Sequence, residues 1–258
     1  AKAVKKYVDL LLTILPFEKD WYAKKGIENV EYVGNPLAGE VRSTLSREEF
    51  CKKHGLDDSR PIIALLAGSR QKEKSRMLPI LVETAAKMSK QNPELQFVNA
   101  LASARGLEEV EEVLEQSQKN GVNLPESFTT VHDETYEALN ASDAAAITSG
   151  TATLESAIIG TPFVMVYATS TFNWKVFRPL ISVEHYSLVN LIAQEETAKE
   201  LIQDELDAHT LSTALFQLLE PQRNREMRER LAEIKEKLGK GGASTRAAEA
   251  VLRLISSD

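Results

Sequence analysis

Many hydrophobic residues of this chain form short continuous runs. In the stretches between these runs, the hydrophobic residues have the spacing of a helix. The apolar runs lie near Pro61–Leu66, Leu95–Ala100, Phe128–Val131, Asp143–Thr148 and Phe163–Tyr167. The stretches that we expect to be helical lie near Met77–Lys90, Leu107–Lys119, Thr135–Asn140 and Thr151–Ile159. Regular alternation of strand and helix predicts an α/β fold with a parallel sheet and helices on both faces. Strands that are apolar throughout fit a sheet covered on both sides.

A shorter strand–helix–strand pattern precedes this alternation. Asp9–Leu15 predicts a buried strand, Pro16–Lys25 a helix with proline in its first turn, and Val30–Val33 a second strand. The first apolar run is too short to span a membrane and has no signal cleavage site. Because the chain opens inside a folding unit, we expect it to be part of a longer protein.

Capping residues and periodicity predict further helices. Ser46 and Glu49 have the spacing of a capping box, which predicts a helix that ends near Gly55. The C-terminal part predicts helices near Ala208–Leu219, Arg223–Leu238 and Ser244–Ile255, with a glycine hinge at Gly239, Gly241 and Gly242. In the last helix one apolar face needs a partner; its residues are Ala248, Val251, Leu252 and Ile255. That partner is another part of the protein or, as a homodimer, a second copy.

Composition narrows the class of protein. The chain has 258 residues, of which 43% are hydrophobic and 27% charged, and its formal net charge is −7. These values are typical of a soluble globular protein, and the absence of a basic face argues against nucleic-acid binding. The single cysteine, Cys51, excludes an internal disulfide. The four histidines have no metal-ligand spacing, so we expect no metal.

The first candidate motif is Leu65–Arg70, at the end of a predicted strand. In open parallel sheets ligands bind beyond the carboxyl ends of the strands. Gly68 allows close approach of the backbone to a ligand, Ser69 offers a hydroxyl, and Arg70 offers a planar fork for phosphate oxygens. A tight turn with a solvated arginine is the alternative interpretation.

The second motif, Thr148–Glu155, also follows a strand and leads into a helix. Small residues at a helix N-terminus favour an anion, and Glu155 can accept hydrogen bonds from a ribose diol. The alternative is a helix whose dipole Glu155 complements. The motif lacks the Gly-Lys-Ser/Thr of a P-loop and the spacing of a dinucleotide fingerprint. A cation for phosphate and a carboxylate for ribose on one sheet together favour binding of a nucleotide sugar.

A third cluster mixes bulky apolar and cationic side chains. Its residues are Trp174, Lys175, Phe177, Arg178 and Leu180. Such a cluster contacts a membrane surface or forms a helix half buried against its neighbours.

At these residues the sequence resembles the lipid-A-disaccharide synthase family. The matching segments follow one another in the order of the family: Ile14–Glu18 with Tyr22, Val33–Leu37, Leu65–Arg70, Ser149–Glu155, Pro162–Tyr167, Ser187–Leu191, Glu200–Gln203 and Leu238–Ser244. The resemblance implies the GT-B architecture, in which two Rossmann-like lobes flank a cleft. It divides the chain into a remnant of the N-terminal, acceptor-binding lobe (1–38), the C-terminal nucleotide-sugar lobe (39–220) and C-terminal helices that cross back (221–258).

The resemblance also implies an activity. The family transfers 2,3-diacylglucosamine from UDP to 2,3-diacylglucosamine 1-phosphate (lipid X), with inversion, and forms the β-1,6-linked lipid A disaccharide. The UDP-sugar is a substrate, no cofactor is implied, and the acylated substrates place the enzyme in the cytoplasm, peripherally at the inner membrane. The implied donor-binding residues are Gly68, Ser69, Arg70, Ser149, Gly150, Thr151, Thr153, Glu155, Asn190 and Gln203.

Some positions depart from the family pattern. Asn35 stands where histidine is usual, Ala67 where proline is common, and Lys199 where many members have proline. Arg70 is the implied catalytic residue, because it opposes the charge of the departing diphosphate. The general base is expected in the missing N-terminal lobe, so this chain alone is expected to be inefficient. The alternatives are another UDP-sugar GT-B enzyme, of the murein glycosyltransferase or UDP-N-acetylglucosamine 2-epimerase type, and a non-catalytic UDP-binding module.

Overall fold

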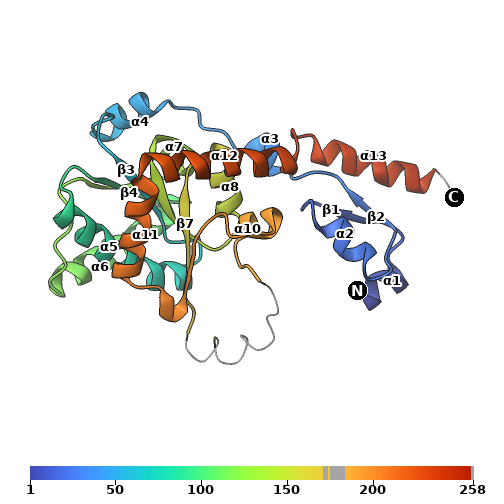
Figure 1. Ribbon diagram of the computed structural model, residues 1–258, viewed down its shortest axis with the longest axis horizontal. Helices are drawn as coiled ribbons and strands as arrows, with labels where there is room; N and C mark the ends of the chain where they lie inside the picture. Colours follow the sequence, from blue (N-terminus) through green and yellow to red (C-terminus); the bar gives the residue numbers. More distant parts are fainter. Residues whose placement is uncertain (171–173, 175–183, 257–258) are drawn as a thin grey trace.

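A parallel sheet forms the core of the larger part of the molecule, on the left in Figure 1. The computed structural model describes residues 1–170, 174 and 184–256. Within them, six strands pair in the order β5-β4-β3-β6-β7-β8. The strands are β3 (Ile62–Leu66), β4 (Gln96–Leu101), β5 (Phe128–His132), β6 (Ala144–Thr148), β7 (Phe163–Tyr167) and β8 (Glu200–Ile202). This is the Rossmann order, in which the chain winds outward from β3 in one direction and then returns to wind outward from β6 in the other. The predicted fold class is confirmed.

Helices cover both faces of this sheet. On one face lie α5 (Gln71–Gln91), α6 (Leu107–Lys119) and α11 (Ala208–Leu219). On the other lie α4 (Arg47–His54), α7 (Thr135–Ala141), α8 (Ala152–Ile159), α10 (Leu188–Ala193) and α12 (Pro221–Leu238). Along β3, the side chains of Ile62, Ala64 and Leu66 belong to the core cluster on the α12 face of the sheet. Those of Ile63 and Leu65 belong to the cluster on the α5 face. The strand is therefore buried on both faces, because successive side chains point to opposite sides.

Most expected boundaries agree with the structure. The five central strands lie within one residue of the expected ends, α6 and α11 have the expected ends, and the Ser46–Glu49 capping box is present. The expected start of α5 at Met77 is wrong, because the helix already begins at Gln71, directly after the loop that follows β3. Residues 71–76 are all polar, so this part of the helix has no apolar period. The short elements β8, α10 and α3 (Leu37–Glu40) were not anticipated.

The N-terminal part forms a separate small parallel sheet. It consists of β1 (Leu11–Thr13) and β2 (Val30–Tyr32), with α1 (Lys2–Tyr7) and α2 (Glu18–Ala23) beside them. The expectation of a buried strand over Asp9–Leu15 is wrong: the strand has three residues, Leu11 and Leu12 are half-buried, and Ile14 is 46% exposed. A sheet of two strands against which α2 packs cannot bury both of its faces.

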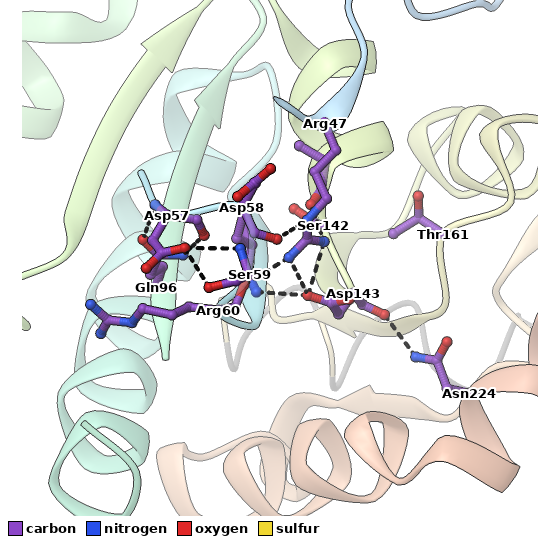
Figure 2. A network of polar contacts seen from close by, with 12 residues as sticks. Arg47, Asp57, Asp58, Ser59, Arg60, Gln96, Ser142, Asp143, Thr161 and Asn224 are labelled. Atoms are coloured by element: carbon purple, nitrogen blue, oxygen red, sulfur yellow. Dashed lines mark hydrogen bonds and ion pairs between the residues drawn. The ribbon is translucent and has the colours of Figure 1, made fainter. Parts of the chain in front are cut away.

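A polar network closes the amino-terminal edge of the main sheet (Figure 2). The Asp143 carboxylate accepts hydrogen bonds from the Ile62 backbone N–H (2.8 Å) and from two guanidinium nitrogens of Arg47 (3.1 Å each). Arg47 also donates to the Ala141 carbonyl, and the Asn224 side chain donates to the Asp143 carbonyl. The network therefore joins α4, β3, β6 and α12 at the edge opposite to the carboxyl ends of the strands.

The last helix, α13 (Ala243–Ile255), returns to the two-stranded sheet (Figure 1). Arg246 Nε donates to the Val33 carbonyl (2.8 Å), and Arg253 pairs with Glu31 (2.7 Å). The preceding α12 instead buries its apolar side in the main core. On α13 much of the expected apolar face is exposed, with Leu252 at 63% and Ile255 at 66%.

The return of the chain depends on a contact between two glycines. Gly241 has φ +84°, and a Cβ atom there would lie 3.0 Å from the Cα of Gly39. We expect Gly241→Ala to lower the free energy of unfolding by about 2–4 kcal/mol, because it adds this clash to the cost of a left-handed alanine, about 1–2 kcal/mol. Gly121 has the same φ but no atom within 4 Å of its Cβ position. Gly121→Ala is therefore the matched control in urea denaturation, and equal losses for the two variants would contradict the clash.

Candidate donor site at the carboxyl edge of the sheet

A cavity opens where the sheet reverses its winding. Strands β3 and β6 are neighbours, and the segments that follow them leave toward opposite halves of the sheet. In this fold type the gap between two such segments is the usual ligand site. A cavity of about 510 Å³ lies there. Its wall consists of Leu66, Gly68, Ser69, Arg70, Glu73, Ala100, Ala102, Thr135, Thr148, Ser149, Gly150, Thr151, Ala152, Glu155, Tyr186 and Leu188.

The loop after β3 supplies the cation of this cavity. Gly68 has φ +96°, a conformation that L side chains rarely adopt. Arg70 is the N-cap of α5, and its side chain is 80% exposed. One guanidinium nitrogen, Nη1, donates to Glu73 Oε1 at 2.7 Å. This hydrogen bond and the charge of Glu73 raise the pKa of Arg70, so the guanidinium stays charged at the mouth of the cavity.

The loop after β6 supplies small residues and the start of a helix. Ser149, Gly150 and Thr151 line the cavity, and Thr151 is the N-cap of α8. A Cβ atom on Gly150 would meet nothing within 4 Å, so open space adjoins the backbone there. Thr153 lies differently: it is fully buried and its Oγ1 donates to the Gly150 carbonyl at 2.8 Å. It therefore braces the loop and does not line the cavity.

Glu155 presents a carboxylate to the same cavity from the first turn of α8. Burial raises its pKa above the ordinary value of 4.5. Its side chain forms no hydrogen bond or ion pair with the residues that the structure describes. A smaller cavity of about 290 Å³, which Asp133 and Tyr136 help to line, also has Glu155 in its wall. A partly buried carboxylate with open acceptor positions suits a ligand that donates hydrogen bonds, such as a diol.

Two further expected donor-binding residues, besides Thr153, lie outside this cavity. Asn190 is fully buried and uses its whole amide: it accepts from the backbone N–H groups of Thr197 (3.0 Å) and Ala198 (2.8 Å), and donates to the Ala198 carbonyl (2.7 Å) and to Glu200 (2.8 Å). Its side chain therefore has no hydrogen-bonding position left for a ligand.

Gln203 forms a similar brace. Its Oε1 accepts from the Thr169 N–H (3.0 Å), and its Nε2 donates to the Thr169 carbonyl (3.1 Å). The expectation that Asn190 and Gln203 line the donor side of the cleft does not agree with this geometry. Both side chains hold backbone segments near the carboxyl edge instead, because irregular segments there need partners for their peptide groups.

Several cavity residues were missed by sequence reasoning. Tyr186 and Leu188 reach the wall from the segment that enters α10. Glu200, at the start of β8, holds that segment: it accepts from the backbone N–H groups of Tyr186 (2.9 Å) and Ser187 (2.8 Å). No local signal indicates this pairing. Glu73 had a signal, since it follows Arg70 by three residues on a helix, where side chains are neighbours.

Other features contribute less to a functional assignment. A larger cavity of about 670 Å³, lined in part by Trp21, Tyr22 and His185, lies between α2 and α10. Of the mixed apolar and cationic cluster, all residues but Trp174 lie outside the described residues.

In the part of the chain that the structure describes, no group of three or more His, Cys, Asp or Glu residues is arranged to hold a metal ion. None of the helices described is both long and apolar enough to cross a membrane.

Comparison with known proteins gives one consistent family. A sequence model described as lipid-A-disaccharide synthetase matches residues 1–254. The lipid-A-disaccharide synthase of Trichlorobacter lovleyi is 38% identical over 255 residues, which are 98% of this chain and 64% of that protein. The Myxococcus xanthus protein of the same name is 37% identical, with the same coverage. The chain thus spans less than two thirds of the length of these curated relatives.

Solved structures of other proteins share the fold. The UDP-GlcNAc 2-epimerase of Neisseria meningitidis bound to UDP-GlcNAc superposes with a TM-score of 0.62 at 15% identity, over 95% of this chain and 62% of the epimerase. Sucrose-phosphate synthase from Thermosynechococcus elongatus gives a TM-score of 0.59 at 15% identity, over 100% of this chain and 61% of that one. At these identities the likeness concerns the fold alone.

Proposed function

This chain belongs to the lipid-A-disaccharide synthase family, and we propose that it forms the UDP-sugar donor site of such a glycosyltransferase. The reaction would transfer 2,3-diacylglucosamine from UDP to 2,3-diacylglucosamine 1-phosphate and release UDP. The observation that carries the proposal is the cavity at the reversal of the sheet, where the Arg70 cation, an open glycine loop and the Glu155 carboxylate meet. A nucleoside diphosphate offers complementary groups to all three.

The proposed roles follow from the chemistry of each group. Arg70, with the backbone of Gly68 and Ser69, would hold the diphosphate, since a guanidinium fork matches phosphate oxygens. Ser149, Gly150 and Thr151 would surround the nucleoside, because they line the cavity and the backbone at Gly150 adjoins open space. Glu155 would accept hydrogen bonds from the ribose hydroxyls. As the glycosidic bond to phosphate breaks, charge builds on the departing UDP, and Arg70 would stabilise that charge.

The proton of the attacking hydroxyl needs a separate base. Within the cavity, Glu73 is already paired with Arg70, and Glu155 is assigned to the ribose. We therefore place the general base in the part of the family's length that this chain does not match. We also propose that residues 1–38 belong to the acceptor lobe and that residues 39–220 form the donor lobe. Helix α13 would then connect back toward the acceptor lobe.

The acyl chains of both substrates suggest where the enzyme works. Sugars with two acyl chains reside in a lipid surface. An enzyme that joins them must therefore bind to that surface, and it need not span the membrane. We place the protein at the cytoplasmic face of the inner membrane as a peripheral protein. Vesicle co-sedimentation with and without the acylated sugar phosphate would test this placement.

Two alternatives are less well supported. A 2-epimerase shares the fold at 15% identity, whereas the curated family relatives reach 38% along nearly the whole chain. A non-catalytic UDP-binding module would have the same cavity, and it differs only in lacking turnover. A transfer assay with the two acylated sugars separates such a module from an enzyme.

The direct test is calorimetric titration of this chain with UDP, and with ADP as the matched control. We expect UDP to bind in the micromolar to low-millimolar range and ADP not to bind. Equal affinity for both would contradict a uridine site. The complete protein, with the remaining part of the family's length restored, should then form the disaccharide from the two acylated sugars. UDP binding without any transfer would support the non-catalytic module.

A further inference from the structure

A carboxylate lies inside the cavity that we assign to the diphosphate. Glu73 lines this cavity, and its side chain is only 20% exposed. Like charges close together repel, so an anionic side chain beside a phosphate site weakens binding unless it has another task. Glu73 was not part of any motif recognised in the sequence, and the proposed roles above do not use it.

The structure makes room for this carboxylate. A Cβ atom on Gly68 would lie 2.9 Å from Glu73 Oε2 and 3.0 Å from the Glu73 Cβ. Cβ atoms almost never approach another heavy atom this closely, so a side chain at position 68 would force Glu73 to shift. The glycine therefore serves two purposes at once. It permits φ +96° and it leaves the space that Glu73 occupies.

The same carboxylate fixes Arg70. Glu73 Oε1 accepts from Arg70 Nη1 at 2.7 Å, and the backbone N–H groups of Glu73 and Lys74 both donate to the Arg70 carbonyl (3.0 Å each). Lys74, which follows Glu73 on the helix, is instead paired with Glu109 at 2.6 Å. Arg70 is otherwise 80% exposed, and a long exposed side chain is mobile unless something holds it.

We propose that Glu73 is a positioning residue that holds the Arg70 guanidinium at the mouth of the cavity, ready for the diphosphate; this rests on the proposed function. A guanidinium has five N–H donors, so one bond to Glu73 leaves the others for phosphate oxygens. Ordering Arg70 before the ligand arrives lowers the entropy cost of binding. The gain depends on Arg70, because without the cation only the repulsion between Glu73 and phosphate remains.

A double-mutant cycle tests this dependence through the sign of the effect. We expect Glu73→Gln to weaken UDP binding by about 3–10-fold in the wild-type background and to strengthen it by about 2–5-fold in the Arg70→Ala background. Glu83→Gln removes the same charge elsewhere on α5 and should change neither affinity. Strengthening in both backgrounds would show that Glu73 only competes with the ligand, and no change in either would show a bystander; both outcomes overturn the proposal.

A measurement without ligand separates this proposal from the proposed function. The Nε–Hε NMR signal of Arg70, assigned by its loss in Arg70→Ala, should report an ordered side chain in the wild type and a mobile one in Glu73→Gln. Equal mobility in the two proteins would overturn the positioning role. If the wild type fails to bind UDP while Arg70 is ordered only in the presence of Glu73, the proposed function fails and the positioning role stands.

Discussion

Replacing Arg70 by alanine is expected to weaken UDP binding by about 30-fold or more while leaving the thermal stability of the chain unchanged. The side chain is 80% exposed, so its loss removes little packing. What disappears is the guanidinium fork at the mouth of the cavity, and Glu73 then faces the diphosphate without a counterion. Charge-assisted bonds to phosphate are among the strongest polar contacts in proteins.

Calorimetry with UDP and a thermal melt of the same sample check the two halves of this prediction. Arg70→Lys keeps the charge but not the planar fork, and we expect it to recover only part of the affinity. In the complete protein, Arg70→Ala should lower kcat by about 100–1000-fold, because charge develops on the departing diphosphate only in the transition state. An unchanged affinity for UDP would remove Arg70 from the donor site.

The second large effect is expected at Glu155, where function and stability should move in opposite directions. Burial raises the pKa of this carboxyl above 4.5, so the fold favours its protonated form. A raised carboxyl pKa adds stability at pH values below about 4.5, and that contribution is lost as the pH rises through the folded-state pKa. Near neutral pH the ionised carboxylate therefore destabilises the chain.

Glu155→Gln removes that charge and keeps the shape. We expect the variant to melt at a higher temperature than the wild type near pH 7, with the difference disappearing near pH 4, and to bind UDP about 10–100-fold more weakly, the effect of one or two lost hydrogen bonds to a charged group. Glu49→Gln is the control of opposite sign, because hydrogen bonds from Ser46 lower the pKa of Glu49. A Glu155→Gln protein that is less stable at neutral pH, or that binds UDP normally, would contradict the assignment.

Much of the fold could be predicted because its signals are local. Apolar runs of five or six residues mark strands buried on both faces, and Ser46 with Glu49 marks the start of α4 through bonds within one turn. The loops at Gly68–Arg70 and Ser149–Glu155 stand out for the same reason: small residues next to a strand end, with a charged side chain close by. These features need no knowledge of distant neighbours.

The strand β8 and the segment before α10 could not be predicted from local patterns. β8 has three residues, too few for a periodic pattern, and its place in the sheet comes from pairing with β7. Asn190 and Gln203 are polar residues in family motifs, which made ligand contact a reasonable expectation. Their actual partners are peptide groups of Thr197, Ala198 and Thr169, which only folding brings within reach.

The sequence by itself therefore determined the class of fold, the succession of strands and helices, and the two loops that carry Arg70 and Glu155. Tertiary structure decided that β3 and β6 are neighbours, which is what places these loops around one cavity. It also decided that Glu73 occupies the space left by Gly68 and that Asn190 is a brace. The physical reason is that secondary structure follows from periodicity and capping along the chain, whereas the partner of a polar side chain depends on which distant backbone packs beside it.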